Sequence, residues 1–428
     1  MHSFWWLLGV LHHVIWVATM LLTVQAMPPP PPIRCEASTG CNLSNSYGIW
    51  GDRKDCHVPS AAHPQTEEDL RLAVAFASKN KVKIKVVSKF SHTIPKLACP
   101  DMSFGDAMLI STANVNSTIE IDAANLAVTV DAGVGLRQLI DKVEEAGLSL
   151  VAAPYWEGVS VGGLISTGAH GSSWWGRGGA VHDHVIGLNL VVPANRSEGY
   201  AKILRLDSKD EIFKAAKVSL GLLGIISKVK LRLEAAFKRS ITYNFTDDAQ
   251  IEDIYMEHAK KYEFGDITWV SDAYLGQQEN SVVVDFNYYR ADDAWTPRFN
   301  EDVWEEVEQL AFFKHGAKPH WAKNRNAAFL DVQKKYPNFN KFLGVKRLLD
   351  PQNILSSEWS DEILFGKAGA KADGCALEGL CICSEDRHCS PVKGYYCQPG
   401  LIYKEARVCR YSSSSVESES DKTNLILD

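Results

Sequence analysis

Hydrophobic residues at helical spacing define the first element that the chain predicts. Leu70, Val74 and Ala77 share one face of a helix that extends to about residue 80. Thr66 is suited to cap its N-terminus, because a hydroxyl there can accept a backbone N–H of the first turn. The apolar run at residues 83–87 follows after a short gap and predicts a strand. Helix and strand in this order indicate an α+β or α/β fold.

The next apolar runs predict two strands and a second helix. The strands are expected at residues 107–112 and 126–131, around a polar turn. Gly133 and Gly135 follow, and they open an amphipathic helix that should end near residue 147. A strand, a G-x-G sequence and a helix also begin a dinucleotide-binding unit, but Gln138 stands where that motif needs its third glycine. A nicotinamide site is therefore disfavoured.

Apolar runs continue on the far side of a glycine-rich stretch. Residues 185–192 predict a long strand, and residues 227–233 predict another. Between them, Ser208 and Glu211 have the spacing of a capping box, which predicts a helix to about residue 219.

The region beyond residue 234 predicts a second α+β unit. Strands are expected at residues 241–245, 267–270 and 282–289, with a helix near residues 251–262. A further helix is expected to begin at an Asn300 cap and to bury four apolar residues, namely Val303, Val307, Leu310 and Ala311.

The glycine-rich stretch, residues 151–188, contains the first candidate chemistry. It holds nine glycines within an apolar frame, and its segment 160–173 has no acidic side chain. Glycine lets the backbone approach a ligand closely, and free backbone N–H groups suit a phosphate. The stretch predicts a pyrophosphate-binding loop, with a tight turn packed against a neighbouring helix as the alternative.

Residues 161–171 read VGGLISTGAHG and resemble the second flavin loop of the vanillyl-alcohol oxidase / p-cresol methylhydroxylase family of FAD enzymes. The sugar-lactone oxidase branch of that family has the most similar version. The resemblance extends over residues 47–411, and it implies a two-subdomain FAD-binding domain of the p-cresol methylhydroxylase (PCMH) type. Carried over to this chain, the predicted FAD-binding residues are Ser88, Lys89, Phe90, Ser91, His92, Thr93, Val159, Gly162, Gly163, Ser166, Thr167, Gly168, His170, Gly171, Gly224 and Ile226.

Two of these positions depend on shorter motifs. His92 stands where family members commonly form a covalent bond to the flavin, but Ser91 and Thr93 replace the usual flanking glycine and serine. Covalent and non-covalent FAD are therefore both open. The sequence GLLGII at residues 221–226 resembles the segment that closes the family's flavin domain and meets the flavin ring.

The sequence PHWAKNR at residues 319–325 resembles the family's H-W-G/A-K signature. The resemblance makes His320 a general base or an orienting group. It makes Lys323 a cation that stabilises negative charge on the flavin or binds a substrate hydroxyl. Residues 350–354 resemble the segment that returns to the flavin domain. Between Val270 and Ser271 the family has a long further part of its substrate-capping domain, so this chain is expected to have a shortened cap.

Composition and the chain ends suggest the compartment. The net charge of −7 argues against nucleic acid as the main partner. Residues 1–26 form an apolar run that ends in Val-Gln-Ala, which predicts a secretory signal peptide rather than a membrane anchor. Four glycosylation sequons fit that interpretation, at Asn42, Asn116, Asn195 and Asn244.

The ten cysteines divide into four before residue 100 and six after residue 374, and both counts are even. Disulfides are favoured over zinc, since no C-x2-C pair occurs. Their connectivity is not readable from the spacing. His182 and His184 form an H-x-H sequence, but no partner cluster lies near them and no metal site is expected.

These observations together predict six segments: a signal peptide at 1–26, a Pro- and Cys-containing segment at 27–49, a PCMH-type FAD-binding domain at 50–234, a shortened α+β substrate domain at 235–365, a Cys-rich module at 366–411 and a disordered tail at 412–428. The resemblance implies an FAD-dependent oxidase of L-gulono-1,4-lactone or a related aldonolactone, in ascorbate formation, with oxygen as acceptor. The alternatives are a secreted carbohydrate or alditol oxidase of the same fold and a flavin-binding extracellular protein without turnover.

Overall fold

The structure is a computed structural model, and it describes residues 30–45, 56–90, 95–102, 105–154, 156–171, 179–238, 240, 257–258, 260–262, 291–366 and 372–412. The predicted signal peptide, the predicted tail beyond residue 412 and the strands predicted at 241–245, 267–270 and 282–289 lie outside these residues, as does most of the helix predicted near 251–262. Within the described part of the chain, every helix is too short or too polar to cross a bilayer.

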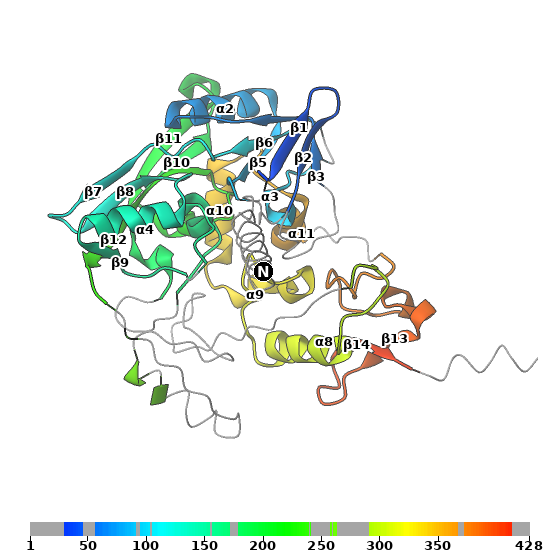
Figure 1. Cartoon of the computed structure of the whole chain (residues 1–428). Helices are drawn as coiled ribbons and strands as arrows, with labels where there is room; N and C mark the ends of the chain where they lie inside the picture. The colour runs from blue at the N-terminus through cyan, green and yellow to red at the C-terminus, as the bar shows by residue number, and fades with distance from the viewer. Residues whose placement is uncertain are drawn as a thin grey trace, which may run out of the picture. The chain divides into compact units, whose positions relative to one another are not determined.

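A small parallel sheet forms the first layer (Figure 1). Its order is β4 (Ser60–Ala62), β6 (Ala107–Ser111) and β5 (Lys83–Val87). Helix α2 (Glu67–Asn80) connects β4 to β5. Thr66 caps it by accepting the Asp69 N–H, and the Asp69 side chain accepts the Thr66 N–H in return. The helix predicted after Thr66 and the strand predicted at 83–87 are thus confirmed.

A larger antiparallel sheet forms the second layer. Its order is β11 (Ala201–Asp207), β10 (Val185–Pro193), β12 (Ile225–Ala235), β8 (Ala127–Asp131) and β7 (Ile119–Asp122), and β9 (Leu148–Leu150) also pairs with β12. Three helices belong to this layer: α4 (Leu136–Glu145), α5 (Val161–Ser166) and α6 (Phe213–Lys217). Strands β7 and β11 were not predicted, because polar residues interrupt the apolar pattern of each.

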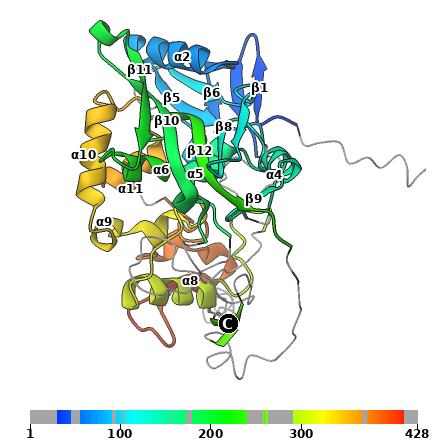
Figure 2. The same cartoon turned by 90° about the vertical axis from the view of Figure 1, so that its left-hand side faces the viewer.

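Helix α2 packs between the two sheets. Its buried residues Leu70, Val74 and Ala77 share a core with Ile84 of β5 and Val191 of β10. Figure 2 shows α2 lying across β5, β6 and β11. A separate core, between the antiparallel sheet and helices α4 and α5, includes Leu139, Leu164 and Val229. Helix α2 therefore joins the two sheets through one shared core.

Three C-terminal helices return the chain to the first layer: α9 (Val332–Lys335), α10 (Phe339–Leu349) and α11 (Glu358–Phe365). Asp350 follows α10 and is 2 % exposed; its carboxylate pairs with Lys346 Nζ at 2.6 Å. The same carboxylate accepts the N–H groups of Ile354 and Leu355, each at 2.9 Å. The Ile354 carbonyl in turn accepts the Ile84 N–H of β5 at 2.7 Å. Residues 350–354 thus return to the first layer, as the resemblance implied.

Two local predictions are wrong. Ser208 and Glu211 form no capping box; instead α6 begins later, at Phe213, and Asp207 and Asp210 organise the preceding turn.

Helix α8 (Glu301–Gln309) does begin after Asn300, but the Asn300 side chain makes no capping bond. Its buried positions are Glu301, Glu305, Glu306 and Gln309, whereas the apolar Val303 is 49 % exposed. Residues Leu310–Lys314 continue it as a π-helix.

The polar face of α8 contacts the Cys-rich module. Glu306 accepts the N–H groups of Leu401, Ile402 and Tyr403. Glu305 accepts the Cys409 N–H at 2.6 Å. Partners for these carboxylates lie on a segment that is remote in sequence, which is why the amphipathic pattern of α8 alone predicted the wrong face.

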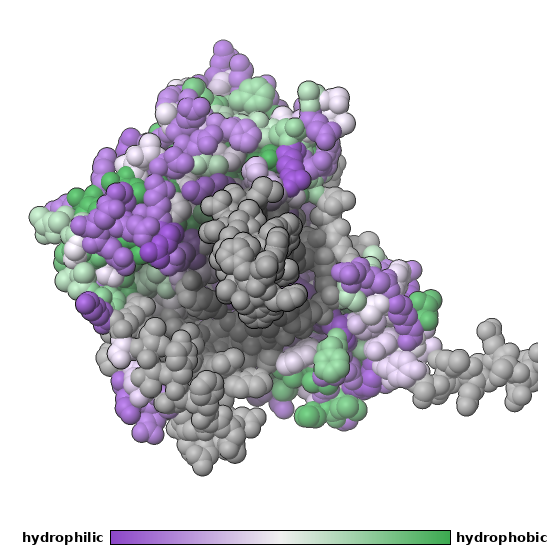
Figure 3. Space-filling view, in the orientation of Figure 1, coloured by the Kyte–Doolittle hydropathy of each residue, from purple (hydrophilic) through white to green (hydrophobic). Residues whose placement is uncertain are grey.

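All ten cysteines are in disulfides, as expected. The N-terminal four pair as Cys35–Cys41 and Cys56–Cys99, near strands β1 (Ile33–Glu36), β2 (Gly40–Leu43) and β3 (Cys56–Val58). The C-terminal six pair as Cys375–Cys381, Cys383–Cys397 and Cys389–Cys409 around the hairpin β13 (Tyr395–Pro399) and β14 (Arg407–Tyr411). Figure 3 shows a small hydrophobic patch at the lower edge of this module, and Leu401 and Ile402 in its hairpin loop are exposed.

Replacement of Asp350 by alanine should lower the free energy of unfolding by about 3–5 kcal/mol, because it leaves a buried lysine and two buried N–H groups without their partner. Glu145→Ala removes an exposed ion pair with Lys142 and should change it by less than about 1 kcal/mol. Denaturant unfolding of both variants measures the difference. Similar losses in the two would contradict the role assigned to Asp350.

Candidate functional site

A cavity of about 180 Å³ lies where the two layers meet. Its lining comes from β5 itself, from the segments that follow β5, β6 and β8, from residues 97–98, from helix α5 with its flanking residues, and from residues 220–226, which lead into β12. Eight of the residues predicted to bind FAD line this cavity: Ser88, Val159, Gly162, Gly163, Ser166, Thr167, Gly224 and Ile226. Segments that are more than 130 residues apart in sequence therefore converge on one apolar, hydroxyl-bearing site.

The glycine stretch enters the site as a short helix and not as an open loop. Ser160 caps α5 through its hydroxyl, which accepts the Gly163 N–H. The Val161 and Gly162 N–H groups donate to the Val134 and Ala132 carbonyls at 2.9 and 2.8 Å. The expectation that N–H groups of this segment are free for a phosphate is therefore wrong for these three residues.

The glycines serve mainly for close packing. A Cβ on Gly162 would lie 2.9 Å from the Ala132 Cβ, and one on Gly224 would lie 2.6 Å from the Leu190 Cγ. At Gly163, by contrast, the only atom within 4 Å of an added Cβ is the Ser160 hydroxyl, at 3.2 Å, among the described residues. Two glycines thus bring the backbone close to neighbouring strands, while Gly163 borders the cavity.

The remaining predicted FAD-binding residues either are not among those that line the cavity or lie outside the described residues. Lys89 and Phe90 lie beside Gly135 at the start of α4. Gly168 has a positive φ of 72°, and the Gly171 N–H donates to the Gly179 carbonyl. Ser91, His92 and Thr93 lie outside the described residues, so covalent attachment at His92 stays a prediction.

The structure brings the H-W-A-K segment to the glycine stretch. The rings of His170 and His320 lie 6.1 Å apart between centroids. Burial, together with Lys323 and His170, lowers the pKa of His320 well below its usual value. The imidazole of His320 is therefore neutral at neutral pH.

A backbone hydrogen bond fixes which nitrogen of neutral His320 carries the proton. The Ala322 N–H donates to His320 Nδ1 at 3.1 Å. Since Nδ1 accepts this bond, the ring proton belongs on Nε2, which makes His320 a hydrogen-bond donor. His182, which was not among the predicted site residues, lies near enough to His170 and His320 to affect them electrostatically, and burial lowers the pKa of His182.

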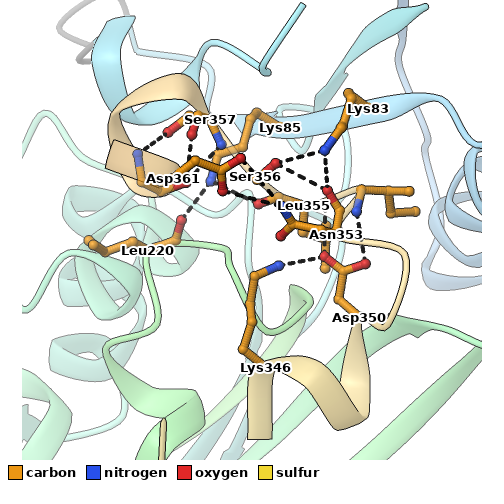
Figure 4. Close-up of polar contacts among 12 residues, drawn as sticks. Lys83, Lys85, Leu220, Lys346, Asp350, Asn353, Leu355, Ser356, Ser357 and Asp361 are labelled. Atoms are coloured by element: carbon orange, nitrogen blue, oxygen red, sulfur yellow. Dashed lines mark hydrogen bonds and ion pairs between the residues drawn. The ribbon is translucent and has the colours of Figure 1, made fainter. Parts of the chain in front are cut away.

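Lys85 was not among the predicted site residues, yet it is 3 % exposed and lines the cavity. Its Nζ donates to the Leu220 carbonyl at 3.0 Å and to the Leu355 carbonyl at 3.5 Å (Figure 4). Burial, and secondarily Lys346, lowers the pKa of Lys85 to about 7. The two lysines within the predicted strand KIKVV were the available signal, because a charged residue in a buried strand needs a partner.

Comparison with known protein families matches three parts of the chain. The FAD binding domain matches residues 59–196, D-arabinono-1,4-lactone oxidase matches residues 241–363, and the C-terminal domain of L-gulonolactone oxidase 2-like proteins matches residues 372–411. Among relatives, L-gulonolactone oxidase 3 of Arabidopsis thaliana is 46% identical, with 92% of this chain and 96% of the relative aligned. L-gulonolactone oxidase 2 of the same plant is 34% identical over the same shares, and L-gulonolactone oxidase of Mus musculus is 21% identical over 74% of this chain and 97% of the relative.

The fold, the cavity and these matches define an FAD-dependent oxidase with a PCMH-type flavin domain. The chain belongs to the plant L-gulonolactone oxidase family, within the sugar-lactone oxidases. The alignment with L-gulonolactone oxidase 3 extends over 565 positions whereas this chain has 428 residues, so at least 137 positions have no counterpart here. This difference agrees with the shortened cap expected at Val270 and Ser271, which lie outside the described residues.

Gly163→Asp should abolish FAD binding, because it places a carboxylate at the cavity beside the negatively charged cofactor. Gly163→Ala is the matched control, since the added methyl group meets only the Ser160 hydroxyl, and this variant should keep its flavin. Flavin absorbance per protein measures both. Full flavin content in Gly163→Asp would contradict the assignment of this cavity to FAD.

Proposed function

We propose that this chain oxidises L-gulono-1,4-lactone or a related aldonolactone, with oxygen as the acceptor, in a reaction that leads toward ascorbate. The observation that carries the proposal is the approach of His320 to His170, which joins the H-W-A-K segment to the flavin segment. The names of the relatives support the lactone as substrate.

The chemistry divides between the cofactor and the chain. FAD, when bound, supplies the acceptor for the hydride from the sugar carbon. Lys323 supplies positive charge near His320, as its effect on the pKa of that ring indicates. His320 donates a hydrogen bond from Nε2 to a substrate oxygen and so orients it. A general-base role for His320 is disfavoured, because Nδ1 is already engaged by the Ala322 N–H.

This short form should oxidise L-gulono-1,4-lactone poorly even when FAD is bound. Orientation of a substrate can supply roughly 7–11 kcal/mol of the barrier, and the missing part of the cap is expected to supply the contacts that orient the lactone. Loss of even about 4 kcal/mol would slow the reaction roughly a thousandfold. Peroxide production per bound flavin measures the effect.

The matched comparison is a version of the chain with the cap segment of L-gulonolactone oxidase 3 inserted between Val270 and Ser271. It should recover turnover at equal flavin content. Equal turnover in the two proteins would show that the shortened cap suffices.

A second candidate function follows from the missing positions: a flavin-binding protein without turnover. Such a protein would bind FAD in the same cavity but would lack a complete substrate site. If bound flavin stayed oxidised under anaerobic conditions with a panel of aldonolactones, sugars and alditols, while the version with the inserted cap segment became reduced, this second function would be favoured.

We also propose that the protein enters the secretory pathway. The apolar leader at residues 1–26 and the five disulfides support this, because disulfides persist in oxidising compartments. Sequons at Asn42 and Asn195 lie at exposed positions. Purified native protein should begin near Met27 and contain no alkylatable thiols. An intact leader, or close to ten free thiols by mass spectrometry, would overturn the proposal.

A further inference from the structure

The side chain of Lys85 lines the flavin cavity. It lies on β5 and is 3 % exposed, and its only described hydrogen bonds are to the carbonyls of Leu220 and Leu355. A lysine ammonium has three donors, so two carbonyls leave one donor for a further group. Leu220 and Gly221 line the cavity together with Lys85, so such a group can lie within the cavity.

The charged groups packed around Lys85 do not neutralise it. Lys346 of α10 repels it, and Lys83 lies on the same strand. The Asp350 carboxylate attracts Lys85 but is paired with Lys346 at 2.6 Å and accepts two N–H groups. Asp361 of α11 also attracts Lys85, but it is already bonded to the Asn353 amide. Within the described residues Lys85 forms no ion pair, and a buried charge without a partner is costly.

We propose that Lys85 is a further cofactor-binding residue, whose ammonium pairs with negative charge of FAD, and that FAD binding is coupled to proton uptake at Lys85. FAD has the required charge on its pyrophosphate, and the flavin ring gains negative charge on reduction. Each would favour the ammonium over the neutral amine.

The sign of the pH dependence follows from linkage. The pKa of Lys85 in the chain without FAD is lowered to about 7 by burial, so above pH 7 the amine is mostly neutral. An anion in the cavity raises that pKa, and FAD binding then returns a proton to Lys85. FAD affinity should therefore be constant below pH 7 and fall by up to tenfold per pH unit above it, until the pKa of the bound state is reached.

Lys83 provides the matched control for Lys85. Both lysines connect β5 to residues 353–356. Lys83 Nζ donates to the Asn353 carbonyl and the Ser356 hydroxyl, and Lys85 Nζ donates to the Leu355 carbonyl (Figure 4). Only Lys85 lines the cavity. A purely structural role for Lys85 therefore predicts equal effects of Lys85→Met and Lys83→Met on FAD affinity.

The test is calorimetric titration of the full-length apoprotein with FAD at pH 7 and pH 8, in two buffers with different ionisation enthalpies. Wild-type protein should take up close to one proton at pH 8. Lys85→Met should lose this uptake and bind FAD at least tenfold more weakly at pH 7, while Lys83→Met should keep both properties. Titration with riboflavin, which is uncharged and lacks phosphate, is a further control: an effect of Lys85→Met on FAD alone supports pairing with the pyrophosphate, and an equal effect on riboflavin contradicts it.

Three results would overturn the proposal: no proton uptake by the wild-type protein, uptake that persists in Lys85→Met, or equal loss of affinity in Lys83→Met. The first needs no variant. If Lys85→Met does not fold, as circular dichroism would show, Lys85→Gln replaces it with a neutral group that can still donate to the two carbonyls.

Discussion

The rest of the structure depends on the buried carboxylate of Asp350. Its pairing with Lys346 and with two consecutive N–H groups fixes the turn after α10, and this turn presents the Ile354 carbonyl to β5. Ile354 and Leu355 then enter the core that α2 shares with both sheets. A segment from late in the chain thereby completes the layer from which Lys85 and Ser88 line the flavin cavity.

Carboxylates that accept backbone N–H groups recur in the contact between α8 and the Cys-rich module. Burial acts to raise the pKa of Glu306, but three N–H groups of the hairpin loop outweigh it, and the pKa is lowered. Among the described residues Glu305 accepts a single N–H, and burial together with the neighbouring Glu301 raises the pKa of Glu305 to about 8. Two adjacent glutamates thus differ in charge at neutral pH, because one has enough donors to stay ionised and the other does not.

In the flavin site, too, the neighbours of a residue decide what that residue does. The glycines of α5 and β12 allow close approach of backbone to backbone, as the short distances from Gly162 and Gly224 show. Charge complementary to the cofactor has to come from elsewhere, and Lys85 of β5 supplies it from a different layer. On the substrate side, a backbone N–H decides that His320 donates a hydrogen bond, although the ring itself could act in either direction.

The sequence by itself determined the elements with strong local patterns and the sites with specific motifs. Helix α2, strand β5 and helix α4 follow from periodicity and capping residues, and the glycine stretch with the H-W-A-K segment determined the flavin family. Tertiary structure decided the pairing of the ten cysteines, the buried face of α8, strands β7 and β11, and the position of Lys85 at the cavity. Strands β7 and β11 pair with strands that are close in sequence, but polar residues interrupt their apolar pattern. The buried face of α8 and the place of Lys85 depend instead on partners more distant than local periodicity can register. A glutamate-rich helix face becomes buried when remote N–H groups meet it, and a lysine in a strand becomes part of a site when other layers close around it.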